Sequence, residues 1–499
     1  MNQPKKIDYK LFSIFAFLLL LVFSCSETIE TPTEQKNFSK PATSEEVIDF
    51  CKAISADNDL ISFKIIGHSA QGKDLIALRA ALSESNTDTL LKVMLFAQQH
   101  GNEQSGKEAL LFLLSRLPKN ADWLENTELW IVPQLNPEGA DNNKRRNSLD
   151  IDLNRDHVVK KAPETKAIHD LFNEVMPHVT VDIHEYNPYS ESWEEFCGYK
   201  NFDVQVGIPT NINVNKQIIS FAENKVLPEI EKHLNKKGFS FHNYLVGPAP
   251  GLGRTRHSTV DINDGRQSFA ILNTLSFIYE GKNGRDSYAD NLKERTYSQY
   301  EAIYALIDFL NINSVLVKQI VEEARGELYF GVNKDKVAIR MEHVSDGSDL
   351  VLPLTSSKTG NDTVAVVEEF HPQVIAKLEV NRPEAYLVPV NDSLLKNLLD
   401  SHEIIYFPYN NLKGQEVTAY KIKEILISED ENLENRFPEV EALSVNKLDE
   451  KYIYVPTAQL HSNFLVLLLE PQSMLGIAQR EGFEYLLKEN EVFPVFRVE

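Results

Sequence analysis

The sequence predicts an α/β fold with a mixed, mostly parallel sheet and helices on both faces, followed by a β-rich and an α+β C-terminal region. Up to about residue 310, short apolar runs alternate with helical stretches, which is typical of a sheet buried on both sides. After residue 311 the runs alternate apolar and polar residues between Gly, Asn and Asp turns. With 42% hydrophobic and 25% charged residues, the 499-residue chain can bury a substantial core.

The first region is predicted to contain buried strands joined by packed helices. The strands are predicted at residues 92–97, 128–132, 179–183 and 275–279, and the helices at residues 107–117, 164–175 and 216–237. Further strands are predicted at residues 328–343, 363–367 and 376–380, and helices at residues 393–401 and near residues 472–488. We therefore expect an α/β domain over residues 44–310, a β-rich module over residues 311–383 and an α+β module over residues 384–499.

The N-terminal segment determines the expected location of the protein. Residues 1–24 combine a basic start with a short apolar run, and a membrane helix would need roughly 20 apolar residues, so a secretory signal peptide is predicted. The run ends at Cys25 and resembles bacterial lipoprotein signals, in which the cysteine becomes the lipid-bearing first residue. An ordinary cleaved signal or an uncleaved anchor remains an alternative. We expect a lipid-anchored protein of the cell envelope, on its periplasmic or cell-surface face, with residues 25–43 as a polar tether.

The charge and the cysteines exclude several classes of protein. Lys and Arg number 51 against 73 Asp and Glu, a net charge of -22, so the chain repels phosphate backbones and nucleic acid is not an expected partner. Three cysteines without a CxxC pair exclude a disulfide scaffold and a structural zinc site.

Polar residues follow three of the predicted strands. His100 and Glu103 follow the first strand, and His184 and Glu280 follow two later ones. Ligands of open α/β sheets gather at the carboxyl ends of the strands, so these side chains should meet. A catalytic zinc ion takes three His or Glu ligands and keeps one position open. A single HxxE pair is also typical of a capped turn, and only the combination favours a metal site.

Three polar motifs lie between the two histidines. They are NPEG at residues 136–139, RRN at residues 145–147 and DLNR at residues 152–155. Arginines clustered near a metal site are costly unless they face an anion, because guanidinium groups match carboxylates and phosphates. Surface loops are the alternative interpretation.

An ordered series of motifs over residues 45–310 resembles the zinc carboxypeptidase family of the carboxypeptidase A and B type. In order, the motifs are IGHSAQGKDL, HGNE, NPEG, RRN, DLNR, DIHE and IYEGKNGRD. The resemblance implies one Zn²⁺ per chain. By this resemblance, His100, Glu103 and His184 are the zinc ligands, and Asp152 orients the first histidine. Glu280 is the general base, and Arg145, with Arg146 as its neighbour, polarises the carbonyl group. Asn154 and Arg155 bind the terminal carboxylate.

The implied activity is that of a zinc-dependent metallocarboxypeptidase, which hydrolyses the C-terminal peptide bond of a peptide or muropeptide. The glutamate assists attack by a zinc-activated water. A substrate without a nearby carboxylate would leave the Arg155 guanidinium unpaired, which favours removal of single terminal residues. The alternative is a zinc amidase or deacylase that acts on cell-wall peptides or acylated amino acids.

The sequence also departs from the family. Its better-known members carry a tyrosine on a loop before the catalytic glutamate, yet residues 247–266 contain none. Four residues of this stretch could cover the substrate instead or lie in a solvated loop, and they are Arg254, Arg256, His257 and Arg266. The substrate side-chain preference stays open. The resemblance of residues 311–499 to extensions of larger bacterial members is weaker and implies no chemistry.

Two other classes of protein compete with a zinc enzyme. Ser69 in GHSAQG resembles the nucleophile turn of a serine hydrolase, but the second glycine comes one position too late, so a hairpin turn is favoured. A surface binding lipoprotein with a degenerate catalytic fold is also possible, since fold does not fix function. All the expected site residues are present, which argues against it.

Overall fold

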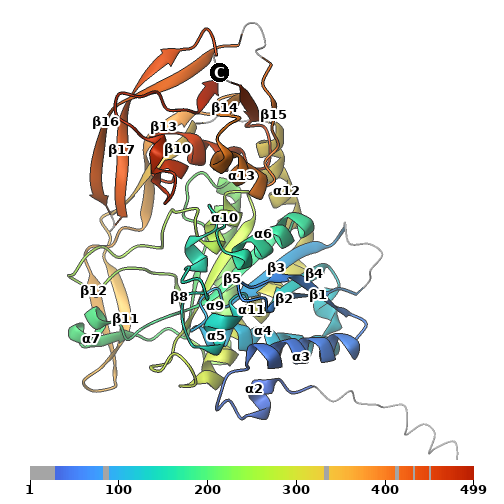
Figure 1. Ribbon diagram of the computed structural model, residues 1–499. Coiled ribbons are helices and arrows are strands. Elements are labelled where there is room, and N and C mark those ends of the chain that lie inside the picture. The colour runs from blue at the N-terminus through green and yellow to red at the C-terminus, as the bar shows by residue number, and fades with distance from the viewer. Residues whose placement is uncertain (1–28, 83–88, 331–335, 411–414, 431–432, 449–450) are drawn as a thin grey trace, which may run out of the picture.

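The computed structural model describes residues 29–82, 89–330, 336–410, 415–430, 433–448 and 451–499 (Figure 1). The signal peptide predicted at residues 1–24 and the predicted lipidation site Cys25 lie outside the described residues.

An eight-stranded mixed sheet forms the centre of the first domain, and it confirms the predicted fold class. Its spatial order is β1-β2-β4-β3-β5-β9-β7-β8. The strands are β1 (Ile61–His68), β2 (Asp74–Ala80), β3 (Leu91–Ala97), β4 (Thr127–Val132), β5 (Val179–Tyr186), β7 (Val204–Gly207), β8 (Phe241–Asn243) and β9 (Leu275–Lys282). The middle strands β4, β3, β5 and β9 run parallel, so their carboxyl ends share one edge.

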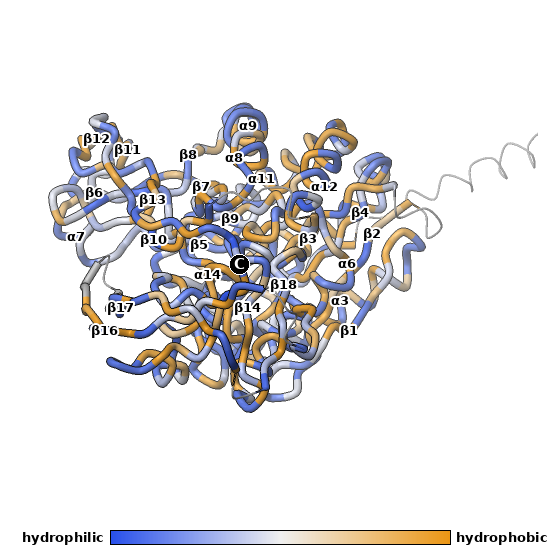
Figure 2. The backbone as a smooth tube through the Cα atoms, turned by 90° about the horizontal axis from the view of Figure 1, so that it is seen from above, coloured by the Kyte–Doolittle hydropathy of each residue, from blue (hydrophilic) through white to orange (hydrophobic). Residues whose placement is uncertain are grey.

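Helices cover both faces of this sheet. On one face, α4 (Gln104–Arg116) packs against α11 (Leu292–Ile312), and Gly106 brings α4 against Ile183 of β5. On the other face, Phe269 of α10 (Gly265–Ala270) stacks on Phe172 of α6 (Pro163–Val175), with ring centroids 4.4 Å apart. Figure 2 shows the apolar stretches of the chain in orange, and the inner strands such as β3 are almost wholly buried.

A long helical segment precedes β8. It joins α8 (Lys216–Phe221), one π-helical turn (Ala222–Val226) and α9 (Leu227–Lys237), where the sequence predicts one helix over residues 216–237. The segment packs against α11.

Residues 29–43 do not form the free tether that their composition predicts. They include α2 (Pro32–Gln35) and lead into α3 (Ser44–Ala56). The buried carboxylate of Glu108 on α4 accepts hydrogen bonds from the Thr33 hydroxyl (2.7 Å) and the Ala42 backbone N–H (2.8 Å). A carboxylate at this depth needs donors, and this segment supplies them.

The Ser69 turn is a hairpin connection, as expected. It joins the antiparallel strands β1 and β2, with Gly72 in the left-handed region at φ 84°. The Ser69 hydroxyl donates to Glu138 at 2.6 Å. This serine therefore has a structural hydrogen bond in the turn.

The region after residue 311 begins with a helix that the sequence analysis did not predict, α12 (Ser314–Phe330). Its two following strand pairs are β10 (Lys336–Val344) with β13 (Gln373–Asn381), and β11 (Leu350–Ser356) with β12 (Asp362–Val367). Within the described residues, α11 joined to α12 is the one segment that is long and apolar enough to cross a membrane by length and composition. Here α11 packs against α4 and α9, and α12 packs against α8 and β3.

The β11–β12 pair is not separate from the first domain. Strand β6 (Gly198–Lys200), which follows α7 (Glu191–Phe196), pairs with β11 and completes a three-stranded sheet. Figures 1 and 2 both show β11 and β12 beside α7. The first domain and the β-rich module therefore share hydrogen-bonded strands.

The last region contains a six-stranded sheet in the order β15-β18-β14-β19-β16-β17. Its elements are β14 (Ala385–Pro389), α13 (Ser393–Ser401), β15 (Phe407–Pro408), β16 (Val417–Asp430), β17 (Leu433–Ser444), β18 (Tyr452–Pro456), α14 (Ser462–Leu469) and β19 (Phe496–Val498). The helix predicted near residues 472–488 is wrong. Only short 3-10 turns form there, at Ile477–Gln479 and Glu484–Leu486, because Gly476 and Gly482 interrupt the segment.

Candidate active site

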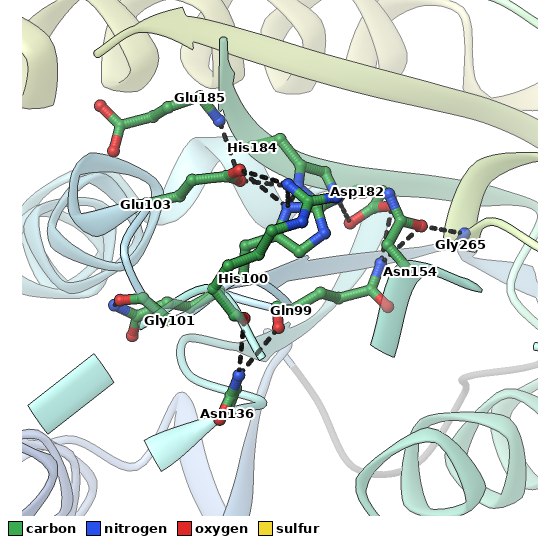
Figure 3. Close-up of polar contacts among 12 residues, drawn as sticks. Gln99, His100, Gly101, Glu103, Asn136, Asn154, Asp182, His184, Glu185 and Gly265 are labelled. Carbon is green, nitrogen blue, oxygen red and sulfur yellow. Dashed lines mark hydrogen bonds and ion pairs between the residues drawn. The ribbon is translucent and has the colours of Figure 1, made fainter. Parts of the chain in front are cut away.

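Two histidines and one glutamate meet at the carboxyl edge of the large sheet (Figure 3). His100 and Glu103 lie in the turn between β3 and α4, and His184 lies on β5. The His100 and His184 Nδ1 atoms are 3.1 Å apart, and each lies 2.7 Å from an oxygen of the Glu103 carboxylate. All three side chains are buried.

The NPEG motif shapes the turn that carries His100. A Cβ atom at Gly101 would overlap the backbone of Gly139, so the two glycines let these backbones touch. The Asn136 amide donates to the Gln99 carbonyl at 3.1 Å and accepts from the Gly139 N–H at 2.9 Å. Asn136 is therefore a structural residue that fixes the ligand turn from below.

The outer nitrogen of each histidine faces a carboxylate. His100 Nε2 lies 3.1 Å from Asp152 Oδ1, and His184 Nε2 lies 2.8 Å from Asp182 Oδ1. This arrangement directs both Nδ1 atoms inward and raises their basicity as ligands. The sequence analysis identified Asp152 but missed Asp182, because a single acid inside the apolar run VTVDI gives no signal of the face on which it lies.

The charges of the cluster suit a divalent cation. Burial alone would raise the pKa of Glu103, but His100 and His184 outweigh it and hold that pKa below its usual range. Zinc–nitrogen bonds of about 2.0–2.1 Å place tetrahedral ligands about 3.3 Å apart, close to the observed separation of the two Nδ1 atoms. Two imidazoles, which bind a metal in their neutral form, and one carboxylate therefore form a donor set that fits zinc.

Glu280 lies beside the cluster on β9. The parallel pairing of β5 and β9 places Glu280 opposite His184, and its side chain is buried. Burial raises the pKa of Glu280 to about 7, with His184 offsetting part of the effect and Glu103 adding to it. A carboxylate with this pKa can accept a proton near neutral pH and release it again.

Tyr244 is a site residue that the sequence analysis missed. It directly follows β8, its N–H donates to the Val206 carbonyl at 3.0 Å, and its hydroxyl is hydrogen-bonded to Glu280. Burial and the nearby Glu280 carboxylate raise the pKa of Tyr244, so its hydroxyl stays protonated. It lies three residues before residues 247–266, which contain no tyrosine, and the short strand in front of it was not predicted.

The structure distinguishes the two neighbouring arginines. Arg145 Nε donates to Asp152 Oδ2 at 3.0 Å, and its Nη1 lies 3.2 Å from His100 Nδ1. Arg146 does not reach the site, because its guanidinium turns back to the Asp150 carbonyl at 2.8 Å. The Arg145 carbonyl accepts the Gly101 N–H, which fixes the backbone so that the Arg145 side chain faces the ligands.

Asn154 and Arg155 lie in a 3-10 turn (Leu153–Arg155) and differ in exposure. The Asn154 amide oxygen accepts the Gly265 N–H (2.7 Å) and the Gln99 amide (3.3 Å), and its NH₂ group lies 3.3 Å from His184 Nε2. Arg155 is exposed at the site, and although burial opposes it, Asp264 and Asp152 raise its pKa.

The loop before Glu280 is braced by the β-rich module. Thr255 exchanges backbone hydrogen bonds with Glu369 and His371, both at 2.9 Å. Phe370 between them packs in an apolar cluster with Leu245, the neighbour of Tyr244. Of the four loop residues predicted as possible substrate contacts, Arg266 is fully buried, and it donates to the Ser258 hydroxyl (2.7 Å) and the Ile208 carbonyl (3.2 Å).

Together, the mixed sheet, the three converging side chains and the buried Glu280 form a site that could hold one metal ion. Residues 47–202 match the model of the zinc carboxypeptidase family. This segment, which carries His100, Glu103 and His184, is therefore similar to the zinc carboxypeptidase family.

The chain is similar to two fungal proteins, each named Carboxypeptidase 2. It is 24% identical to that of Trichophyton rubrum over 257 residues, which cover 48% of this chain and 47% of the relative. It is 24% identical to that of Trichophyton tonsurans over 378 residues, which cover 70% of this chain and 66% of the relative. The chain thus spans between about half and two thirds of the length of these curated relatives.

Similar solved structures also carry carboxypeptidase names. A metallo-carboxypeptidase from Pseudomonas aeruginosa shares 18% identity with a TM-score of 0.43, over 56% of this chain and 70% of that chain. The carboxypeptidase A from Helicoverpa armigera shares 14% identity with a TM-score of 0.45, over 63% of this chain and 83% of that chain.

Proposed function

We propose that this protein is a zinc-dependent carboxypeptidase that removes the C-terminal residue of peptides. The observation that carries the proposal is the convergence of three ligand atoms beside Glu280, which adjacent strands hold opposite His184. A zinc ion held by His100, Glu103 and His184 would supply Lewis acidity that activates a water molecule.

Glu280 moves the proton in this proposal. Its carboxylate accepts a proton from the attacking water and delivers it to the nitrogen of the leaving amine. The Tyr244 hydroxyl hydrogen bonds this carboxylate and orients it before the substrate arrives. The raised pKa of Glu280, about 7, makes both proton transfers accessible near neutral pH.

Arg145 stabilises the carbonyl oxygen in this proposal. Its Nη1 lies at the mouth of the cluster, 3.2 Å from His100 Nδ1, where a carbonyl oxygen next to the metal would be within reach. Asp152 holds both partners, since Oδ1 faces His100 and Oδ2 accepts from Arg145. One carboxylate thus orients a ligand and the arginine together.

Arg155 supports cleavage at a chain end. An exposed, permanently charged guanidinium can bind a terminal carboxylate with two parallel hydrogen bonds, and the Asn154 NH₂ group lies on the same turn. A substrate with no terminal carboxylate could not form this pair of parallel hydrogen bonds.

A digest of a mixed peptide pool followed by mass spectrometry tests the proposal. The protein should start at residue 25 with Cys25 replaced, and each peptide should be supplied with a free and with an amidated C-terminus. We expect stepwise loss of single C-terminal residues from the free peptides, which stops when zinc is chelated. A zinc-loaded protein that cleaves neither form, but releases an amino acid from muropeptides or acylated amino acids, would support the amidase or deacylase alternative.

We also propose that the protein is attached to a cell-envelope membrane through a lipid on Cys25. The support is the basic start, the short apolar run and the cysteine at its end. Expression with a radiolabelled fatty acid should label the protein, and C25A should remove the label. Labelling that survives C25A would contradict this attachment.

A further inference from the structure

An arginine that packs against two tyrosine rings follows the strand that carries Glu280. The guanidinium carbon of Arg285 is 4.3 Å from the ring centroid of Tyr189 and 5.3 Å from that of Tyr199. The two rings meet edge to face at 5.0 Å. Arg285 Nη2 also donates to the Tyr199 hydroxyl at 3.4 Å, and we call these three residues the Arg285 platform.

The platform follows the two strands that carry His184 and Glu280. Pairing between β5 and β9 continues past these residues to Tyr186 opposite Lys282, and the Asn283 N–H then donates to the Tyr186 carbonyl at 3.0 Å. Tyr189 comes shortly after the end of β5, and Arg285 comes shortly after the end of β9. The platform therefore lies just beyond the strand ends that form the site.

A buried ion pair connects the Arg285 loop to a zinc ligand. The Glu185 N–H donates to Glu103 Oε2 at 3.1 Å, and the Glu185 carboxylate binds Arg295 through two hydrogen bonds of 2.8 and 2.9 Å. Arg295 also donates to the carbonyls of Tyr288 and Asp290, in the loop that follows Arg285. The loop is thereby fixed relative to the ligand cluster before any substrate binds.

The loop that follows Arg285 is tied to the side of the site on which Glu185 lies. Figure 3 shows Glu185 and Glu103 on one side of the two histidines, and Asn154 and Gly265 on the other. If Arg155 binds the terminal carboxylate, as the proposed function requires, the rest of the peptide extends toward the Glu185 side. The Arg285 loop is linked to that side through Arg295 and Glu185.

We propose that the Arg285 platform is a subsite for an acidic side chain of the substrate, N-terminal to the scissile bond. The Arg285 side chain is 58% exposed, and the nearest Glu194 oxygen lies 3.8 Å away, so the rings fix its position more than this loose ion pair does. Its guanidinium fork matches a carboxylate. On a chain with a net charge of -22, an acidic peptide needs such a local cation to bind.

Paired peptides test this subsite, which rests on the proposed function. One peptide series carries a single Glu at the second, third or fourth position from the C-terminus, and a matched series carries Gln there. The wild-type protein should prefer Glu at one of these positions by about fivefold in kcat/KM, the order expected for one partly exposed charge pair. R285Q should lose this preference through KM with kcat unchanged, and R285K should keep part of it.

A second stacked arginine provides the matched control. Arg116 lies 4.1 Å from the Phe112 ring, far along α4 from the ligand turn, and R116Q should keep the preference for Glu. Thermal unfolding and zinc content should show that R285Q is folded and loaded. Equal cleavage of both series by the wild-type protein, or a preference that survives R285Q, would overturn the subsite alone. Absence of any cleavage would overturn the carboxypeptidase function and the subsite with it.

Discussion

Asp152 is the residue on which two functions of the site depend, because one carboxylate holds both His100 and Arg145. We expect D152N to weaken zinc binding by about 10- to 100-fold, the usual effect of losing the partner of a ligand histidine, and to lower kcat as well. Competition with a chromophoric chelator measures the affinity. D150N is the matched control, since the Asp150 side chain is 91% exposed. Unchanged zinc affinity in D152N would contradict the assignment.

Glu280 should be essential for turnover but not for zinc binding. E280Q keeps the shape and the Tyr244 contact but cannot accept a proton, so kcat should fall by about 10²- to 10⁴-fold. Zinc content measured on the same preparation should equal that of the wild-type protein. Near-normal turnover in a zinc-loaded E280Q sample would exclude Glu280 as the base.

The dependence of kcat/KM on pH should reflect the ionisation of Glu280. Burial raises the pKa of Glu280 to about 7, and a base must be ionised, so kcat/KM should fall as the pH drops through that pKa. A zinc ion nearby favours the ionised carboxylate, which places this acid limb at pH 7 or below. Initial rates between pH 4.5 and 8 measure it, and activity that rises on acidification would contradict the role.

At the scale of elements, strand pairing between distant segments holds the substrate loop. Phe370 is 8% exposed and packs beneath the loop that Thr255 anchors, so F370A should destabilise the protein by about 3 kcal/mol and raise KM. V351A on β11 is the control, because Val351 is 59% exposed and should tolerate the change. Denaturant unfolding and peptide kinetics give the two values. A destabilised F370A with an unchanged KM would limit Phe370 to a packing role.

The elements also show what a sequence can reveal about this fold. The ligands His100 and His184 follow apolar runs whose ends are visible in the sequence, so local patterns sufficed to bring them to one edge. The β6–β11 pairing joins residues about 150 positions apart, and the three residues of β6 have no strand signal of their own. Tyr244 depends on this long-range packing, and so it could not be identified before the fold was known.

At the scale of the whole molecule, buried histidines lie where the first domain meets the C-terminal region. His157 lies 3.0 Å from His169, and His402 Nε2 donates to the Val158 carbonyl at 2.8 Å. Burial lowers the pKa of His157 and of the neighbouring His461 to about 3, with Lys160 adding to the effect on both. These imidazoles therefore resist protonation in the folded protein.

Acid should therefore destabilise the protein. The unfolded histidines bind protons below their ordinary pKa of about 6.5. Folded His157 and His461 bind them only near pH 3, and burial also holds the pKa of His402 well below its usual value. Stability is therefore lost as the pH falls from about 6.5 toward 3. Calorimetry at pH 7.5, 6 and 5 should show a falling Tm, with a shallower slope for H402Q. H68Q is the control, since His68 is 62% exposed, and an unchanged slope in H402Q would contradict this origin.

The shared β6–β11 sheet also implies an order in which the site is assembled. Lys200 of β6 donates to the Leu245 carbonyl beside Tyr244, and its partner Leu354 lies about 150 residues later in the chain. Ribosomes add roughly 5–20 residues per second, so the emerging zinc ligands precede this partner by roughly 8–30 s. Until then the wall of the substrate site lacks its supporting strand. We therefore expect the site to be completed only after the residues near 354 have paired with β6.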